Sequence, residues 1–209
     1  MVRQRARIRF RKQGDLRLIG HRDLARLLER LFRRAGLRLG MSEGFHPKPR
    51  MSFPSALALG IEGLDEVMEL ELAESCTADE LLERLARHAV PGLSFAGVEI
   101  LPCGAKKARL RSAAYELPVP AARQQDVAAR LERLSGNPAD SAGEAEEPAA
   151  ALLRRSLEEI QLCDGILRFR LRARRQRSAG PRDVLATIGL DDLEPQGACL
   201  ARSEVRLEP

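Results

Sequence analysis

Residues 21–50 read HRDLARLLERLFRRAGLRLGMSEGFHPKPR, and the rest of the chain is arranged around this stretch. Apolar residues recur at helical spacing from Leu24 to Ala35, which predicts a helix over residues 22–35 with one apolar face. Gly36 follows, and glycine commonly stands just past the end of a helix. A short extended run then leads into the loop SEGFHPKPR, residues 42–50. The stretch therefore predicts a helix that buries its leucines against a sheet, followed by a stiff basic loop.

Strand patterns surround this stretch. Residues 3–11 alternate arginine with apolar or neutral side chains, which predicts a strand with one cationic face and one apolar face. After the loop we expect strands over residues 51–59, 67–72 and 93–101. Between the last two strands we expect a helix that begins with a Thr77–Glu80 capping box. The element order of this half is strand, helix, strand, strand, helix, strand.

The second half repeats that order without residue-level identity. Its expected elements are strands over residues 113–119, 157–162, 166–173 and 198–207, and helices over residues 121–134 and 181–188. Residues 135–150 are rich in Gly, Pro, Ala and Glu and predict a mobile insertion. The predicted fold is therefore α+β, with two tandem ferredoxin-like (βαββαβ) units and antiparallel sheets. The predicted domains are residues 1–105, which contain the GFHPKPR loop, and residues 106–209.

Composition excludes several classes of protein. The 209 residues are 44% hydrophobic but contain no apolar run near the roughly 20 residues that span a bilayer. The basic N-terminus lacks the apolar segment of a signal peptide. Four widely spaced cysteines form no CxxC pair and suit free thiols in a reducing compartment. These features predict a cytoplasmic protein with no membrane partner and no self-contained zinc or iron–sulfur site built from its cysteines.

Charge is distributed unevenly along the chain. Residues 1–50 contain fifteen Lys/Arg and four Asp/Glu, whereas residues 51–105 contain two Lys/Arg and ten Asp/Glu. Such asymmetry favours an anionic partner for the first segment. The alternative is that the arginines follow genome composition and pair with carboxylates inside the fold.

Arginine ladders are expected on two central strands. One follows the alternation of residues 3–11, and the other is formed by Arg168, Arg170 and Arg172. Cationic rows of this kind can follow a phosphate backbone. The alternative is cross-strand pairing with glutamates on the neighbouring strands, namely Glu69, Glu71 and Glu116.

The loop over residues 42–50 is a more specific candidate. Gly44 permits unusual backbone geometry, and two prolines at alternate positions restrict the backbone before them. The expected result is a pre-ordered display of His46, Lys48 and Arg50, which lowers the ordering cost of binding. The alternative is a structural crossover in which Phe45 fills the core.

A catalytic or metal site is a second hypothesis. His21 precedes the first helix in the sequence GHRD, and His21 and His46 could converge with Asp23 or Glu43 on a metal ion or a proton-transfer site. The sequence contains no P-loop, GxGxxG, GxSxG or HExxH motif. No catalytic residue and no metal ligand are therefore assigned.

The block over residues 18–63 resembles the family of radical SAM-linked proteins. These are domains of unknown function, either free-standing or joined to a B12-binding radical SAM protein. The resemblance is carried by a Gly/Ser–His–x–Asp opening, an arginine-rich helix and the Ser-x-Gly-Phe-(Asn/His)-Pro-(Lys/Arg)-Pro loop. Gly20 stands where serine is common in the family, and His46 where asparagine is common.

The resemblance implies a non-catalytic accessory module that works with a radical SAM protein. An iron–sulfur cluster, SAM and B12 would then belong to the partner, and this chain would hold no cofactor. We combine this with the charge pattern and predict an anionic substrate, with RNA as the first choice. The residues expected to bind the substrate or anion are His21, Asp23, Arg33, Arg34, Ser42, Gly44, Phe45, His46, Pro47, Lys48, Pro49 and Arg50.

Overall fold

The computed structural model of the chain describes residues 3–135, 148–173 and 179–208. They form a mixed α+β protein with two compact units, one running to Leu110 and including Leu207 and Glu208, the other spanning Arg111–Arg206. The elements of the first unit are β1 (Gln4–Lys12), the 3-10 helix η1 (Gly14–Leu18), α1 (His21–Arg34), β2 (Met51–Ser52), β3 (Glu62–Leu72), α2 (Ala78–Arg87) and β4 (Leu93–Leu101). Those of the second are β5 (Leu110–Pro118), α3 (Ala121–Ser135), α4 (Pro148–Ser156), β6 (Leu157–Cys163), β7 (Ile166–Arg172), α5 (Pro181–Thr187) and β8 (Ala201–Leu207).

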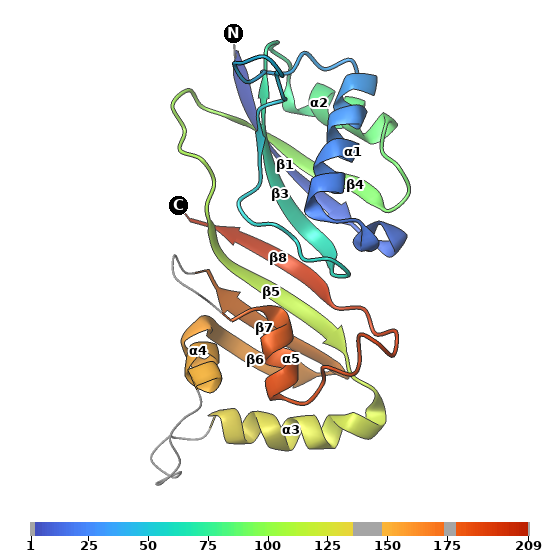
Figure 1. Cartoon of the computed structure of the whole chain (residues 1–209), viewed down its shortest axis with the longest axis vertical. Helices are drawn as coiled ribbons and strands as arrows, with labels where there is room; N and C mark the ends of the chain where they lie inside the picture. Colours follow the sequence, from blue (N-terminus) through green and yellow to red (C-terminus); the bar gives the residue numbers. More distant parts are fainter. Residues whose placement is uncertain (1–2, 136–147, 174–178, 209) are drawn as a thin grey trace. The chain divides into compact units, whose positions relative to one another are not determined.

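The sheet of the first unit is antiparallel and has β1 near its centre. β1 pairs with β3 on one side and β4 on the other, and β2 pairs with β3. Because side chains alternate along a strand, Ala6, Ile8 and Phe10 of β1 all face inward and are buried. They share one hydrophobic core with residues of α1 and α2, so both helices cover the same face of the sheet (Figure 1). The arginines of β1 lie on the opposite face.

The helical pattern of α1 is confirmed. Its buried residues are Leu24, Leu28, Leu31 and Phe32, which follow the predicted apolar face. The helix gives way at Gly36, whose φ of +66° lies in the left-handed region that favours glycine. The sequence therefore determined both the extent of α1 and the face that it buries.

The capping box that begins α2 is also confirmed. The Thr77 side chain accepts a hydrogen bond from the Glu80 backbone N–H at 3.2 Å, and the Glu80 carboxylate accepts one from the Thr77 N–H at 2.8 Å. The Thr77 hydrogen bond also lowers the pKa of Glu80 below its usual value. The stability that ionised Glu80 adds through the cap is therefore fully present above the ordinary glutamate pKa. It is lost as pH falls through the lowered pKa of Glu80 in the folded protein.

We expect Thr77→Ala to lower the free energy of unfolding by about 1 kcal/mol, because it removes the side-chain acceptor at the start of α2. Chemical denaturation followed by far-ultraviolet circular dichroism would measure this loss. Thr187→Ala is a matched control, since Thr187 lies at the end of α5 and its hydroxyl donates to the Asp183 carbonyl within that helix. An equal loss in both variants would contradict a specific capping role.

The predicted strand over residues 51–59 is wrong for most of its length, because only Met51–Ser52 pairs with β3. Pro54 cannot donate a ladder hydrogen bond, and the chain leaves the sheet there. Leu57 is still buried, so apolar residues in a coil produced the strand-like pattern. The next strand, β3, begins at Glu62, five residues earlier than the expected residue 67.

The strands of the second unit follow the order β8-β5-β7-β6. β6 and β7 form the predicted hairpin, and its turn residues Asp164 and Gly165 both have positive φ, at 54° and 73°. This geometry matches the two-residue turn that an Asp-Gly pair favours. Tyr115 and Phe169 stack with ring centroids 5.3 Å apart on the apolar side of the sheet.

The predicted mobile insertion falls largely outside the described residues. Residues 136–147 are not described, and the remainder of the predicted segment is helical, at the end of α3 and the start of α4. The sequence analysis missed α4. Pro148 at its first position was the available signal, because proline is favoured at the first position of a helix.

Candidate functional site

The arginines on the open face of the first sheet are paired with carboxylates. Arg7 lies 3.1 Å from Glu69 and 3.3 Å from Glu99, so it bridges the strands on both sides of β1. Arg9 lies 2.5 Å from Asp65. Glu69 is only 2% exposed, which makes its pair with Arg7 the most deeply buried of these contacts. Internal pairing therefore accounts for this part of the first ladder.

The ladder of the second unit is paired in the same way. Arg170 contacts Glu159 at 2.7 Å and Glu204 at 2.6 Å. Burial alone would lower the pKa of Arg170, but its hydrogen bonds to these two carboxylates raise it above the usual value. Arg168 pairs with Glu116, and Arg172 pairs with Glu158. Of the two interpretations of the ladders, the structure favours cross-strand pairing.

The loop over residues 42–50 is closed by its own hydrogen bonds. The Ser42 backbone N–H donates to the Lys48 carbonyl at 2.8 Å, and the Lys48 N–H donates to the Ser42 hydroxyl at 3.0 Å. Outside this pair, Met41 bridges to Pro49, and the Arg50 N–H donates to the Gly40 carbonyl at 2.7 Å. Gly44 near the tip has a φ of +118°, a backbone angle that residues other than glycine rarely adopt. The loop is thus a small hairpin with a defined backbone.

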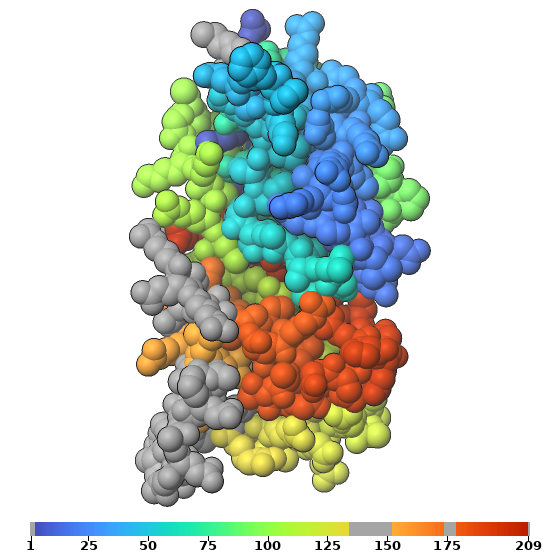
Figure 2. Space-filling view, viewed as in Figure 1, coloured from blue at the N-terminus to red at the C-terminus, as the bar shows by residue number. Residues whose placement is uncertain are grey.

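The tip of this hairpin displays an aromatic ring and basic side chains. Phe45 is 101% exposed, and His46, Pro47 and Lys48 are exposed as well. Pro49, by contrast, is buried and anchors the base of the loop. The segment that contains the loop, light blue to cyan, lies at the surface in the upper part of Figure 2. The alternative in which Phe45 fills the core is wrong, because the ring points into solvent.

Arg50 is held at the base of the loop by two carboxylates. Its guanidinium lies 3.4 Å from Glu71 of β3 and 3.8 Å from Glu43 of the loop. The side chain is still 41% exposed, so it keeps a face open to solvent. Arg50 therefore connects the loop to the open face of the sheet.

The other predicted site residues lie on α1. His21 begins the helix, and its ring lies nearly perpendicular to the ring of Phe53, with centroids 4.8 Å apart. Asp23 pairs with Arg26, and Arg33 pairs with Glu29, one turn away within the same helix. Exposed pairs of this kind contribute little to stability. Arg34 is exposed on the last turn of the helix.

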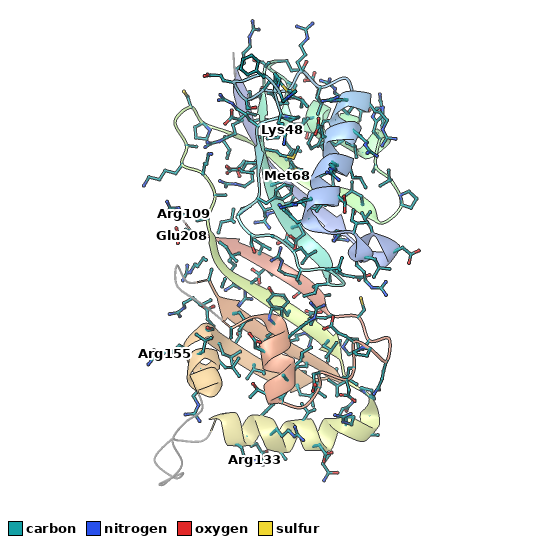
Figure 3. All side chains as sticks on the ribbon, in the orientation of Figure 1. Lys48, Met68, Arg109, Arg133, Arg155 and Glu208 are labelled. Carbon is teal, nitrogen blue, oxygen red and sulfur yellow. The ribbon has the colours of Figure 1, made fainter. Side chains whose placement is uncertain are left out.

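His21 and the loop are not brought together. α1 has 14 residues, which corresponds to about 21 Å of helix. Figure 1 shows the loop beyond the end of α1 that is opposite to His21, and Figure 3 places Lys48 toward that end. Among the described residues, no group of three His, Cys, Asp or Glu side chains is arranged to hold a metal ion. The structure joins Ser42, Lys48 and Arg50 but separates them from His21 and Asp23.

Sequence reasoning missed the segment that follows β4. Arg5 donates hydrogen bonds to the backbone carbonyls of Ala105 and Lys106, and the Ala108 N–H donates to Glu69. These contacts hold residues 105–108 over the open face of the first sheet. The available signal was the basic run Lys106–Lys107, which ends a long acidic stretch.

Residues 5–160 match a family described as "Uncharacterized protein conserved in bacteria (DUF2344)". The chain belongs to this family. The matched region includes the loop, the open face of the first sheet and the segment over residues 105–108.

Other comparisons add little. No curated protein matches the chain. A crystal structure of an unknown protein from Galdieria sulphuraria aligns over 99% of both chains, with 11% sequence identity and a TM-score of 0.30. A score this low supports no argument about fold or function. Across the described ranges, no helix has both the length and the apolar character needed to cross a membrane.

Proposed function

We propose that this protein is a non-catalytic accessory module that binds RNA and presents it to a radical SAM enzyme. The observation that carries the RNA part is the closed loop over residues 42–50, with Phe45 fully exposed beside His46 and Lys48. The radical SAM partner is supported by the sequence resemblance of residues 18–63. An iron–sulfur cluster, SAM and B12 would belong to that partner.

The loop suits single-stranded RNA for a chemical reason. Exposed aromatic rings stack on bases of any sequence, and cations beside them attract the phosphate backbone. Phe45 supplies the ring, and Lys48 supplies a cation three residues away. The two hydrogen bonds between Ser42 and Lys48 hold the loop in shape before binding, which lowers the entropy lost on association.

We expect Phe45→Ala to weaken binding of a fluorescein-labelled ten-nucleotide single-stranded RNA about tenfold, because stacking on one aromatic side chain contributes about 1–3 kcal/mol. Fluorescence anisotropy at low salt would measure the affinity. Leu18→Ala is the matched control, because Leu18 is an apolar residue of the same unit with 59% exposure. Failure of the unmodified protein to bind this RNA at low salt would contradict the proposed function.

The partner is tested separately. Affinity purification of the full chain from source cells should recover a radical SAM protein, identified by mass spectrometry. If the full chain is recovered under conditions that preserve weak complexes and no radical SAM protein is recovered with it, this part of the proposal is contradicted.

We also infer that each unit is ferredoxin-like. The support is the strand arrangement: β1 lies between β4 and β3, β2 pairs with β3, and the second unit has the order β8-β5-β7-β6. A cytoplasmic location belongs to the same proposal, and its reducing conditions suit the four cysteines, which form no disulfide bond in the described part of the chain.

A further inference from the structure

Two adjoining cavities lie on the open face of the first unit, next to the loop. One has a volume of about 290 Å³ and the other about 470 Å³. Both are lined by Arg5, Arg50 and Glu71. Lys107 also lines the first cavity, and Arg3 the second. Because the two cavities share these three residues, we treat them together and call them the Arg5–Arg50 groove.

The groove has an excess of positive charge. Four cations line it, namely Arg3, Arg5, Arg50 and Lys107, against the carboxylates of Glu69 and Glu71. Glu69 is already neutralised by Arg7 at 3.1 Å, and Glu71 is the partner of Arg50 at 3.4 Å. The charges of Arg3, Arg5 and Lys107 are therefore not balanced by a carboxylate of the groove.

Arg5 differs from Arg7 and Arg9, the next two arginines of β1. Its register partner on β3 is Glu71, yet Glu71 pairs with Arg50 instead. The Arg5 guanidinium donates to the neutral backbone carbonyls of residues 105 and 106. Arg7 and Arg9, by contrast, each contact a carboxylate. Arg5 is thus fixed in position while its charge remains available to an anion.

The groove also continues the loop. Arg50 is both the last residue of the loop and part of the wall of both cavities. Arginine binds phosphate through paired N–H donors in a fixed geometry, and phosphate contacts need no base recognition. A single-stranded RNA with one base stacked on Phe45 would therefore contact cations along the adjoining groove.

We propose that the Arg5–Arg50 groove binds phosphodiester groups of the single-stranded RNA whose base contacts Phe45. Arg5 and Arg50 contact the phosphates directly, and Lys107 adds a further cation at the edge. This inference rests on the proposed function and assigns the backbone-binding surface that the loop alone does not supply.

The test uses the full chain and the same labelled ten-nucleotide RNA. Arg5→Gln should weaken binding about tenfold, since it removes a charged hydrogen-bond donor to phosphate. It should also reduce the slope of log affinity against log salt concentration by about 0.7, the value for one phosphate contact on a single strand. Arg9→Gln is the matched control on the same strand and face, because Arg9 is paired with Asp65, and it should change neither value.

Arg5→Gln also removes the hydrogen bonds to residues 105 and 106, so a second variant separates binding from folding. Lys107→Ala changes an exposed side chain of the groove and should reduce the salt slope by a similar amount. If RNA binding depends on Phe45 but both groove variants behave like Arg9→Gln, the groove assignment is overturned and the proposed function stands. If the unmodified protein binds no RNA, both fail. If polyglutamate displaces the labelled RNA at a lower concentration than unlabelled RNA does, the assignment is also overturned, since this would indicate an acidic polypeptide ligand.

Discussion

Replacing Phe32 with alanine should lower the free energy of unfolding by about 3–5 kcal/mol. Phe32 lies on α1, is 0% exposed and belongs to the core between the helices and sheet of the first unit. Its removal leaves a cavity in addition to the lost burial of the ring. Urea denaturation followed by far-ultraviolet circular dichroism would measure the loss, which suits a chain without tryptophan.

Two controls define the Phe32 result. Leu18→Ala should change the unfolding free energy by less than about 0.5 kcal/mol, because Leu18 is 59% exposed. Phe32→Leu should cost less than Phe32→Ala, since it leaves a smaller cavity. Equal losses for Phe32→Ala and Leu18→Ala would mean that the core is not where the structure places it.

Replacing Arg7 with alanine should lower the free energy of unfolding by about 3 kcal/mol. Arg7 is the ion-pair partner of Glu69, whose side chain is 2% exposed. Without Arg7, Glu69 keeps the Ala108 N–H at 3.2 Å, and its second oxygen already has no hydrogen-bond partner in the described residues. The variant therefore leaves a buried carboxylate with little compensation, which costs more than the ion pair itself contributes.

Arg9→Ala is the matched control for Arg7→Ala. Arg9 lies two residues along the same strand, and its pair with Asp65 is more exposed, at 42% and 25%. Its loss should cost about 0.5 kcal/mol. A double variant, Arg7→Ala with Glu69→Met, should recover part of the stability, because it also removes the buried charge. No recovery in the double variant would show that Arg7 acts through packing and not through Glu69.

Several elements were predictable because their signals are local. The apolar spacing of α1, the Thr77–Glu80 capping box and the Asp164–Gly165 turn each depend on residues close in sequence. β4 spans Leu93–Leu101, as expected. Errors arose where a local pattern had two solutions, as in residues 53–59, where apolar residues pack from a coil instead of a strand.

The candidate site was only partly predictable. The prolines and Gly44 indicated a stiff loop, and the structure shows one closed by Ser42 and Lys48. The full exposure of Phe45 could not be predicted, because a large apolar residue is more often buried. The importance of Arg5 was missed for a different reason, since five arginines alternate along residues 3–11 and nothing local separates them.

The sequence by itself determined which faces of β1 and α1 are apolar, because that depends only on the spacing of neighbouring residues. It also determined that residues 42–50 form a stiff basic loop. Tertiary structure decided which carboxylate each arginine meets, because the register of β1 against β3 joins residues about 60 positions apart. In that register Glu69 pairs with Arg7, whereas Glu71 pairs with Arg50. Arg5 donates to backbone carbonyls instead. The same uniform row of arginines thus pairs with carboxylates at Arg7 and Arg9, whereas Arg3 and Arg5 line the cationic groove.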